Sequence, residues 1–165
     1  VVSLVTFSVK HVDGRIFVQL GKLEGRKLSA CCRLPGGKLE KGELPVDAVG
    51  RLLKTKLSLL GPDGIDFVSL RQQTDIKKSE KYDVCTKYMK TVCDISFSQV
   101  VQAPMCRSEG TPKGKPQHDP SLDLSSAYCV LDCSSGGTKI EFFGWVTAQE
   151  FDTLSTNGDD VILSW

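Results

Sequence analysis

The sequence predicts an α/β fold, in the broad α+β sense, with a central mixed sheet and two helices. Alternating apolar and polar residues between glycine-containing turns indicate strands over most of the chain. Helix signals occur in two places, after a glycine-rich turn at residues 35–37 and again after residue 146. The 165 residues are expected to form a single domain, residues 1–165, which buries about two thirds of its unfolded surface.

Three strands are expected before the glycine-rich turn. Alternation over Val1–Lys10 and Arg15–Leu20, around a hairpin signal at residues 12–14, indicates two paired strands. Polar residues at Lys22–Lys27 indicate a loop, and Leu28–Leu34 has the pattern of a third strand. This third strand would lead the chain into the Pro-Gly-Gly turn.

The segment after this turn is predicted to be a helix over Pro45–Leu57. Its proline suits the first helical turn, where the missing N–H breaks no hydrogen bond. Gly36 and Gly37 are expected to adopt backbone angles that side chains forbid, as a tight turn requires. The apolar residues that recur at helical spacing are Ala48, Val49, Leu52, Leu53 and Leu57.

Two longer strands are expected in the middle of the chain. A turn signal at residues 61–64 precedes a strand over Ile65–Gln73. The lysine-rich stretch Asp75–Lys81 is predicted to be a solvated loop, and Val84–Phe97 a longer strand.

The last third of the chain begins with a stretch of different composition. Ala103–Ser126 is rich in proline, glycine and polar residues and is predicted to be a flexible loop insertion, residues 103–126. Strands are expected at Ala127–Cys133 and Lys139–Phe143. A helix then starts at Thr147, whose hydroxyl would form a capping box with Glu150.

Composition excludes several classes of protein. A net charge of +1 gives no polyanion-binding tail, and no apolar run reaches the ~18 residues of a membrane span. The seven cysteines are odd in number, form no CxxC pair and fall in apolar runs, which predicts reduced thiols and an intracellular protein. A zinc site is disfavoured because His11 and His118 lie far from any cysteine pair. Because the chain begins at Val1, it is expected to be a fragment of a larger protein.

Residues 36–51 resemble the first half of a Nudix box, the motif with which Nudix hydrolases bind Mg²⁺ and a nucleoside diphosphate. The motif spaces a Gly, a Glu and an Arg as Gly37, Glu43 and Arg51 are spaced here. The order of elements also resembles the family, including the Trp145–Glu150 segment that opens the last helix. The matching scaffold residues are Gly36, Gly37, Glu40, Gly42, Glu43 and Arg51.

This resemblance implies an α/β/α sandwich around the mixed sheet. It also implies burial of Ala48 and Leu53, and an ion pair in which Glu43 and Arg51 hold the loop against the helix. The alternative is that these two charges are unrelated and solvated.

The chemical half of the motif is missing. In the family, helix glutamates at i, i+3 and i+4 share one face and supply oxygen ligands to Mg²⁺. The corresponding positions here are Leu52, Thr55 and Lys56, and a final glycine is replaced by Ser58. A lysine 4 Å from Mg²⁺ would repel it by about 2 kcal/mol even in water. The resemblance therefore predicts a degenerate, catalytically inactive member with no metal and no cofactor.

Residual hydrolysis remains an alternative, because other carboxylates could approach the same place. Glu40 and Glu43 lie in the adjoining loop, and Asp83, Asp94 or Glu141 could come near through the fold. Two loop glutamates would hold a metal weakly. The sequence contains no serine elbow, phosphate-binding loop or Cys–His signature for covalent catalysis.

Three binding functions remain. Degenerate members of the resembled family act as scaffolding, ribosomal, RNA-processing and channel-regulatory modules, which favours a domain that binds protein partners. A second hypothesis is a metal-independent sensor of a nucleotide or inositol phosphate, with Arg51 and Lys56 as the anion's counter-charges; Lys56 could equally be a solvated lysine. RNA binding is disfavoured by the balanced charge and the 7% aromatic content.

Overall fold

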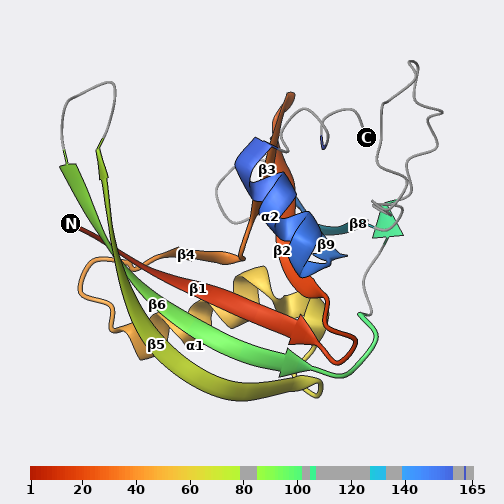
Figure 1. Cartoon of the computed structure of the whole chain (residues 1–165), viewed down its shortest axis with the longest axis horizontal. Helices are drawn as coiled ribbons and strands as arrows, with labels where there is room; N and C mark the ends of the chain where they lie inside the picture. Colours follow the sequence, from red (N-terminus) through yellow and green to blue (C-terminus); the bar gives the residue numbers. More distant parts are fainter. Residues whose placement is uncertain (79–84, 102–104, 107–126, 133–138, 158–161, 163–165) are drawn as a thin grey trace.

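The computed structural model describes residues 1–78, 85–101, 105–106, 127–132, 139–157 and 162. In this part of the chain, nine strands form one sheet in the order β5-β6-β1-β2-β9-β8-β7, with β3 paired to β2 and β4 to β1 (Figure 1). Strands β1 and β6 run parallel and the other pairs antiparallel, so the predicted mixed sheet is confirmed. The elements are β1 Val2–His11, β2 Ile16–Glu24, β3 Lys27–Arg33, β4 Gly36–Lys38, α1 Pro45–Lys56, η1 Ser58–Leu60, β5 Ile65–Lys78, β6 Cys85–Phe97, β7 Met105–Cys106, β8 Ala127–Asp132, β9 Lys139–Val146 and α2 Ala148–Asn157.

The two helices cover opposite faces of the sheet. The larger core cluster joins the inward side chains of β1, β6 and β9 to α1, and Phe17 stacks on Phe143 with ring centroids 5.4 Å apart. The smaller cluster joins β2 and β3 to α2 through Val18 and Leu154. In Figure 1, α2 lies across β2 and β3 while α1 lies behind β1 and β6. The α/β/α arrangement is thereby confirmed.

Both predicted helices are present. Helix α1 ends at Lys56, one residue before the predicted end, and the short helix η1 follows it. At the start of α2, Glu150 Oε2 accepts the Thr147 N–H at 2.6 Å, and Thr147 Oγ1 accepts the Glu150 N–H at 3.2 Å. The capping box is therefore confirmed. No helix within the described ranges is long and apolar enough to cross a bilayer.

Two predicted loops are wrong, because backbone pairing continues through polar sequence. The Lys22–Lys27 segment is mostly hairpin: β2 runs to Glu24, β3 starts at Lys27, and Glu24 pairs with Lys27 in the ladder. Strand β5 likewise extends through Lys78, where the Asp75–Lys81 loop was expected, and Asp75 forms an ion pair with Lys90 of β6. Polar side chains suit this part of β5 because residues 71–74 are all exposed. Residues 79–81 lie outside the described residues.

The role expected for the two glycines is also corrected. Positive φ angles occur at other glycines, such as Gly14 in the first hairpin with φ of 92°, and not at Gly36 or Gly37. Both instead belong to β4, which pairs with β1. A Cβ at Gly36 would lie 2.2 Å from the Val5 carbonyl oxygen, so close backbone approach excludes a side chain there.

Most of the predicted Ala103–Ser126 insertion lies outside the described residues. Within it, Met105–Cys106 forms the short strand β7 against β8, so this part is not loop. Val84 and Cys133, at the ends of two predicted strands, are also outside the described part of the chain.

Candidate functional site

The loop between β4 and α1 is held to the helix by Glu43 and Arg51. Arg51 Nε donates to Glu43 Oε1 at 2.7 Å, and Arg51 Nη2 donates to Glu43 Oε2 at 2.8 Å and to the Lys38 carbonyl at 3.1 Å. Glu43 Oε2 also accepts the Glu40 N–H at 2.8 Å. Hydrogen bonds from Arg51 and then from the Glu40 amide lower the pKa of Glu43 to about 2. The ion pair implied by the resemblance is therefore present.

Of the three positions that would carry metal-binding glutamates, the first is buried in the core. Leu52 is 2% exposed and belongs to the main core with Ala48, one turn before it. Its side chain packs on Gly37, where an added Cβ would lie 2.7 Å from Leu52 Cδ2. Leu52 therefore belongs to the apolar stripe predicted from the sequence, and Thr55 and Lys56 follow it one turn later. The exposed Thr55 donates its hydroxyl to the Arg51 carbonyl at 3.0 Å.

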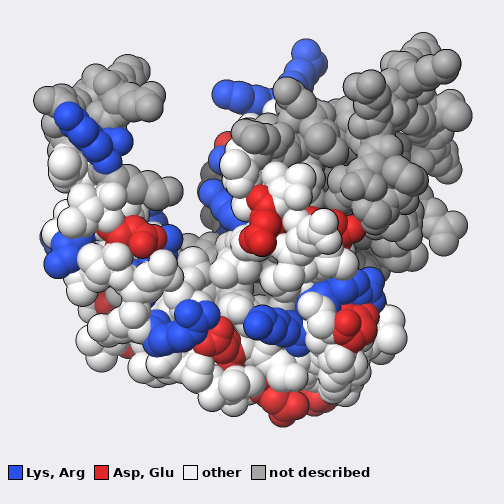
Figure 2. All heavy atoms as spheres, viewed as in Figure 1, with Lys and Arg blue, Asp and Glu red and all other residues white. Residues whose placement is uncertain are grey.

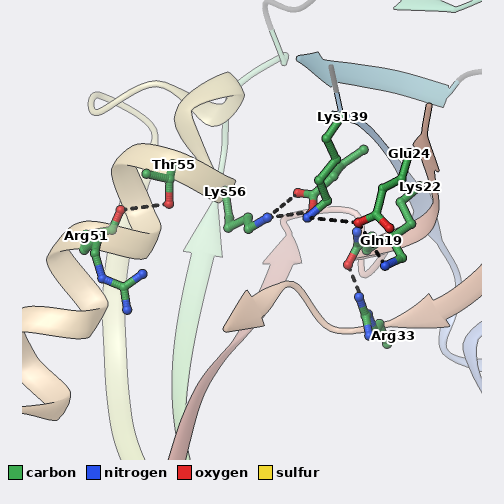
Figure 3. A network of polar contacts seen from close by, with 9 residues as sticks. Gln19, Lys22, Glu24, Arg33, Arg51, Thr55, Lys56 and Lys139 are labelled. Atoms are coloured by element: carbon green, nitrogen blue, oxygen red, sulfur yellow. Dashed lines mark hydrogen bonds and ion pairs between the residues drawn. The ribbon is translucent and has the colours of Figure 1, made fainter. Parts of the chain in front are cut away.

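Lys56 points from the last turn of α1 to a carboxylate on β9 (Figure 3). Its Nζ lies 2.6 Å from Glu141 Oε1 and 2.7 Å from Oε2, and Lys139 Nζ lies 2.9 Å from the same Oε1. The Glu141 side chain is 4% exposed and that of Lys56 19%. Burial raises the pKa of Glu141, but hydrogen bonds from Lys56 and Lys139 outweigh it and leave the pKa below its ordinary value. Glu141 is therefore a buried carboxylate that two ammonium groups keep ionised.

A second polar group lies next to this ion pair. Gln19 of β2 is 5% exposed, and its Oε1 accepts a hydrogen bond from Arg33 Nε at 3.0 Å. Because a guanidinium only donates, this bond fixes the orientation of the amide. Gln19 Nε2 then has no hydrogen-bond partner among the described residues. Figure 3 shows Gln19 between Arg33 and the side chains of Glu24 and Lys22.

Sequence reasoning singled out Lys56 and named Glu141 only as one of several carboxylates that could come near. It missed Gln19, Arg33 and Lys139 altogether. One signal was available: Glu141 shares a strand face with Phe143, so it had to be buried and to need a counter-charge. Lys139 lies two residues before it on the same face.

The residues at these positions do not fit the divalent metal that Nudix hydrolases bind. Leu52 offers no oxygen, the Thr55 hydroxyl donates to the backbone, and Lys56 is a cation already bound to Glu141. Glu43 is held by Arg51, and Glu40 Oε1 lies 3.4 Å from Arg51 Nε. Across the described ranges, no three His, Cys, Asp or Glu residues come close enough together to hold a metal ion.

The other carboxylates considered as substitutes are no better placed. Asp94 of β6 accepts hydrogen bonds from Arg71 of β5 at 2.6 and 2.9 Å. Lys56 contacts β9, and β1 and β2 lie between β6 and β9 in the sheet. The Arg71 and Ser69 hydrogen bonds lower the pKa of Asp94 to about 2. Asp83 lies outside the described residues.

A cleft of about 590 Å³ lies beside the glycine strand β4, between β5, β6 and α2. It corresponds to the hollow in Figure 2 between the β5–β6 hairpin and the α2 side of the molecule. Phe151 forms part of its wall. The cations that line it are Arg33, Lys38, Arg71 and Lys90.

These four cations differ in how they are compensated. Arg71 and Lys90 are paired with Asp94 and Asp75. Arg33 contacts the neutral Gln19, and Lys38 forms no ion pair with another described residue. Positive charge is thus left over at the β3–β4 end of the cleft.

Comparison with known proteins gives a fold relationship. No protein-family model and no curated protein sequence matches the chain. Among solved structures, an Ap4A hydrolase of Caenorhabditis elegans superimposes with a TM-score of 0.52 at 9% identity, covering 99% of this chain and 93% of the hydrolase. A Nudix hydrolase from Nitrosomonas europaea superimposes with a TM-score of 0.46 at 14% identity, and the match covers 98% of this chain and 84% of the hydrolase. A MutT structure, from a study of Aliivibrio salmonicida and Vibrio cholerae MutT, superimposes with a TM-score of 0.33 at 14% identity. The match covers 99% of this chain and 98% of the MutT chain.

The first of these similarities spans almost the whole chain. The mixed sheet between two helices and the glycine strand that precedes α1 agree with the resemblance found in the sequence. The chain therefore has the fold of the Nudix hydrolases.

Proposed function

We propose that this chain is a catalytically inactive Nudix-fold domain that acts by binding a protein partner, as an interaction or scaffolding module. The single observation that carries the proposal is the ion pair of Lys56 with the buried Glu141. In the resembled enzymes, the end of this helix holds carboxylates for Mg²⁺. Here a lysine is built into the chain at that place, and its own counter-charge comes from β9.

The ion pair opposes metal binding in two ways. Mg²⁺ would have to approach an ammonium group, which repels it, and would have to compete for Glu141, whose two oxygens are already engaged. Breaking the pair is costly because it would leave the charge of the buried Glu141 compensated by Lys139 alone. Glu43 is bound on both oxygens as well, by Arg51 and by a backbone amide.

Exposed apolar residues on β5 and β6 support binding to a protein partner. Phe67, Val68, Leu70 and Ile76 of β5 are each between 58% and 70% exposed, and Met89 of β6 is 42% exposed. Apolar residues that gather on one part of a surface usually mark interaction sites. Lys, Arg, Asp and Glu are interspersed over the face seen in Figure 2, which does not suggest a polyanion as the partner.

The test is a hydrolysis assay with Ap4A, a nucleoside diphosphate sugar and a nucleoside triphosphate, each with Mg²⁺ or Mn²⁺. We expect no product above the rate without protein. Turnover by the native chain that is lost in Glu43→Gln and kept in the exposed loop variant Lys41→Gln would contradict the proposal. Both variants must show the native circular dichroism spectrum for that comparison.

A second candidate function is metal-independent binding of a nucleotide or inositol phosphate. The observation that favours it is the uncompensated charge of Arg33 and Lys38 in the cleft beside β4. Arg51 and Lys56, the residues first considered for this role, each hold a carboxylate of the chain. The cleft is therefore the better location for an anion.

Thermal shift with nucleotides and inositol phosphates, in EDTA, tests this second function. A ligand at 100 times its dissociation constant should stabilise the fold by about 2.7 kcal/mol. We expect Lys38→Glu to weaken binding at least tenfold and Lys41→Glu, in the neighbouring loop, to leave it unchanged. Absence of any shift at millimolar ligand would remove the sensor function and leave the interaction module.

A further inference from the structure

Strand β5 forms one end of the sheet and is unusually long for an edge strand. It has 14 residues, and no strand of the described chain pairs with its outer edge. In Figure 1 it forms the outer border of the β5-β6-β1 layer. A long edge strand with exposed apolar side chains offers a row of free N–H and C=O groups to another strand. Edge strands of this kind need a partner or a protecting device.

An irregular stretch lies at the beginning of β5. A register shift between Phe67 and Ser69 interrupts the ladder with β6 there, and pairing is unbroken from Ser69 to Lys78. Within this regular stretch, Leu70 and Ile76 point to one face of the sheet, while Arg71, Gln73 and Asp75 point to the other. Leu70 and Ile76 are 58% and 70% exposed.

We propose that two copies of this chain associate through antiparallel pairing of their β5 edges, centred on Gln73. In that register Leu70 lies opposite Ile76 of the second copy, and Arg71 lies opposite Asp75 of the second copy. Each pair occurs twice because the arrangement has twofold symmetry. Apolar residues and opposite charges placed directly across two strands both stabilise a sheet.

The charges already present in each copy extend across this junction. Asp94 of β6 holds Arg71 at 2.6 Å, and Lys90 of β6 forms an ion pair with Asp75. Pairing at Gln73 therefore generates the sequence Asp94, Arg71, Asp75 of the second copy, Lys90 of the second copy. Negative and positive charges therefore alternate through four strands at these positions.

Neighbouring registers lack this complementarity. Centring the pair on Gln72 places Leu70 opposite Thr74 and Arg71 opposite Gln73. Centring it on Thr74 places Leu70 opposite Lys78 and Gln72 opposite Ile76. The strand is thus complementary to itself in one register, which argues for a second copy rather than an unrelated strand. The inference goes beyond the proposed function, because a hydrolase with this edge would pair in the same way.

Light scattering on a sizing column, with the whole chain, gives the first test. We expect a mass twice the 18.0 kDa of one chain. The interface is small, so the dissociation constant should be on the order of 10 µM. Arg71→Asp and Asp75→Arg should each be monomeric, because like charges then face each other. The exposed loop variant Lys41→Asp should remain dimeric.

An equimolar mixture of Arg71→Asp and Asp75→Arg is the decisive sample. In the mixed dimer every Asp again faces an Arg, so mixing two monomeric variants should restore the dimer mass. A native chain that is monomeric at concentrations on the order of 100 µM would overturn the proposal. So would a mixture that stays monomeric although both variants keep the native circular dichroism spectrum.

A crosslink gives a test that needs no charge change. Residues at the symmetry centre have Cβ atoms about 4.5–5.5 Å apart, within reach of a disulfide after a small adjustment. Gln73→Cys should therefore form a covalent dimer under mild oxidation, more than tenfold faster than Thr74→Cys or the native chain. Equal rates for the two variants would contradict the register.

Discussion

Lys56 places a positive charge at the end of α1, against a buried carboxylate of β9. Its ammonium group lies 2.6 Å from the Glu141 carboxylate, which the Lys139 ammonium group also approaches at 2.9 Å. A buried carboxylate stays ionised at low cost only while positively charged partners compensate it. Lys56 is therefore a structural cation that joins the end of α1 to β9.

The first prediction concerns this ion pair. Lys56→Met keeps the length of the side chain but removes its charge, and leaves Glu141 with Lys139 alone. We expect the free energy of unfolding at pH 7 to fall by about 2 kcal/mol, less than for a pair with no remaining partner. Chemical denaturation measures this change. In the Glu141→Gln background the same substitution should cost much less, and equal costs in both backgrounds would show that the two residues are not coupled.

The second prediction concerns Glu43 and Arg51. Arg51→Ala should lower Tm at pH 7 by roughly 3–8 °C, because the loop loses its connection to the helix. The pKa of Glu43 is lowered from 4.5 to about 2 in the folded chain, so its contribution is complete above pH 4.5 and is lost as pH falls towards 2. The Tm difference between native chain and variant should shrink over that range. Lys54→Ala, an exposed lysine of the same helix, should change Tm little at any pH.

At the scale of elements, the glycine strand β4 depends on close contacts rather than on unusual backbone angles. A Cβ at Gly36 would meet backbone atoms of β1, whereas a Cβ at Gly37 would meet the flexible end of Leu52. Backbone cannot move without disturbing the ladder between β1 and β4, but a leucine can change rotamer. The two neighbouring glycines should therefore differ in their tolerance of substitution.

The third prediction follows from that contrast. Gly36→Ala should lower the free energy of unfolding by about 3 kcal/mol, and Gly37→Ala by about 1 kcal/mol. Gly50→Ala serves as the control, because a Cβ there meets nothing within 4 Å and alanine favours the helix by about 0.5–1 kcal/mol. Urea denaturation gives all three values. Equal losses at positions 36 and 37 would contradict the packing described for β4.

The fourth prediction concerns the start of α2. Thr147→Ala removes the hydroxyl that accepts the Glu150 N–H and should cost about 1 kcal/mol. Thr147→Ser keeps the acceptor and should cost little. If both variants lost the same stability in urea denaturation, the capping box would not be the cause.

Local sequence signals predicted the elements well and their ends less well. The capping box of α2 and the proline at the start of α1 lie within one helical turn, so the sequence contains the whole interaction. The expected loops at Lys22–Lys27 and Asp75–Lys81 failed because polarity was taken as evidence against pairing. An antiparallel hairpin accepts polar side chains on an open face, and only the fold shows which face is open.

At the scale of the whole molecule, contacts distant in sequence were the ones that could not be predicted. Glu43 and Arg51 are 8 residues apart and follow from motif spacing, whereas Lys56 and Glu141 are 85 residues apart and meet only through the sheet. Leu52 was expected both in the apolar stripe with Ala48 and at a degenerate ligand position, and its burial in the main core agrees with the apolar stripe. The cleft residues Arg33 and Lys38 come together by strand pairing, which no local pattern reports.

The measurement that tests the central claim most directly is a Mn²⁺ titration of the native chain, followed by the electron paramagnetic resonance signal of free Mn²⁺. If Lys56 and Glu141 form a closed ion pair where a metal would otherwise bind, the signal should show no site with a dissociation constant below about 1 mM. A stoichiometric site tighter than that, weakened by Glu43→Gln or Glu141→Gln but not by Asp66→Asn on distant β5, would contradict the account.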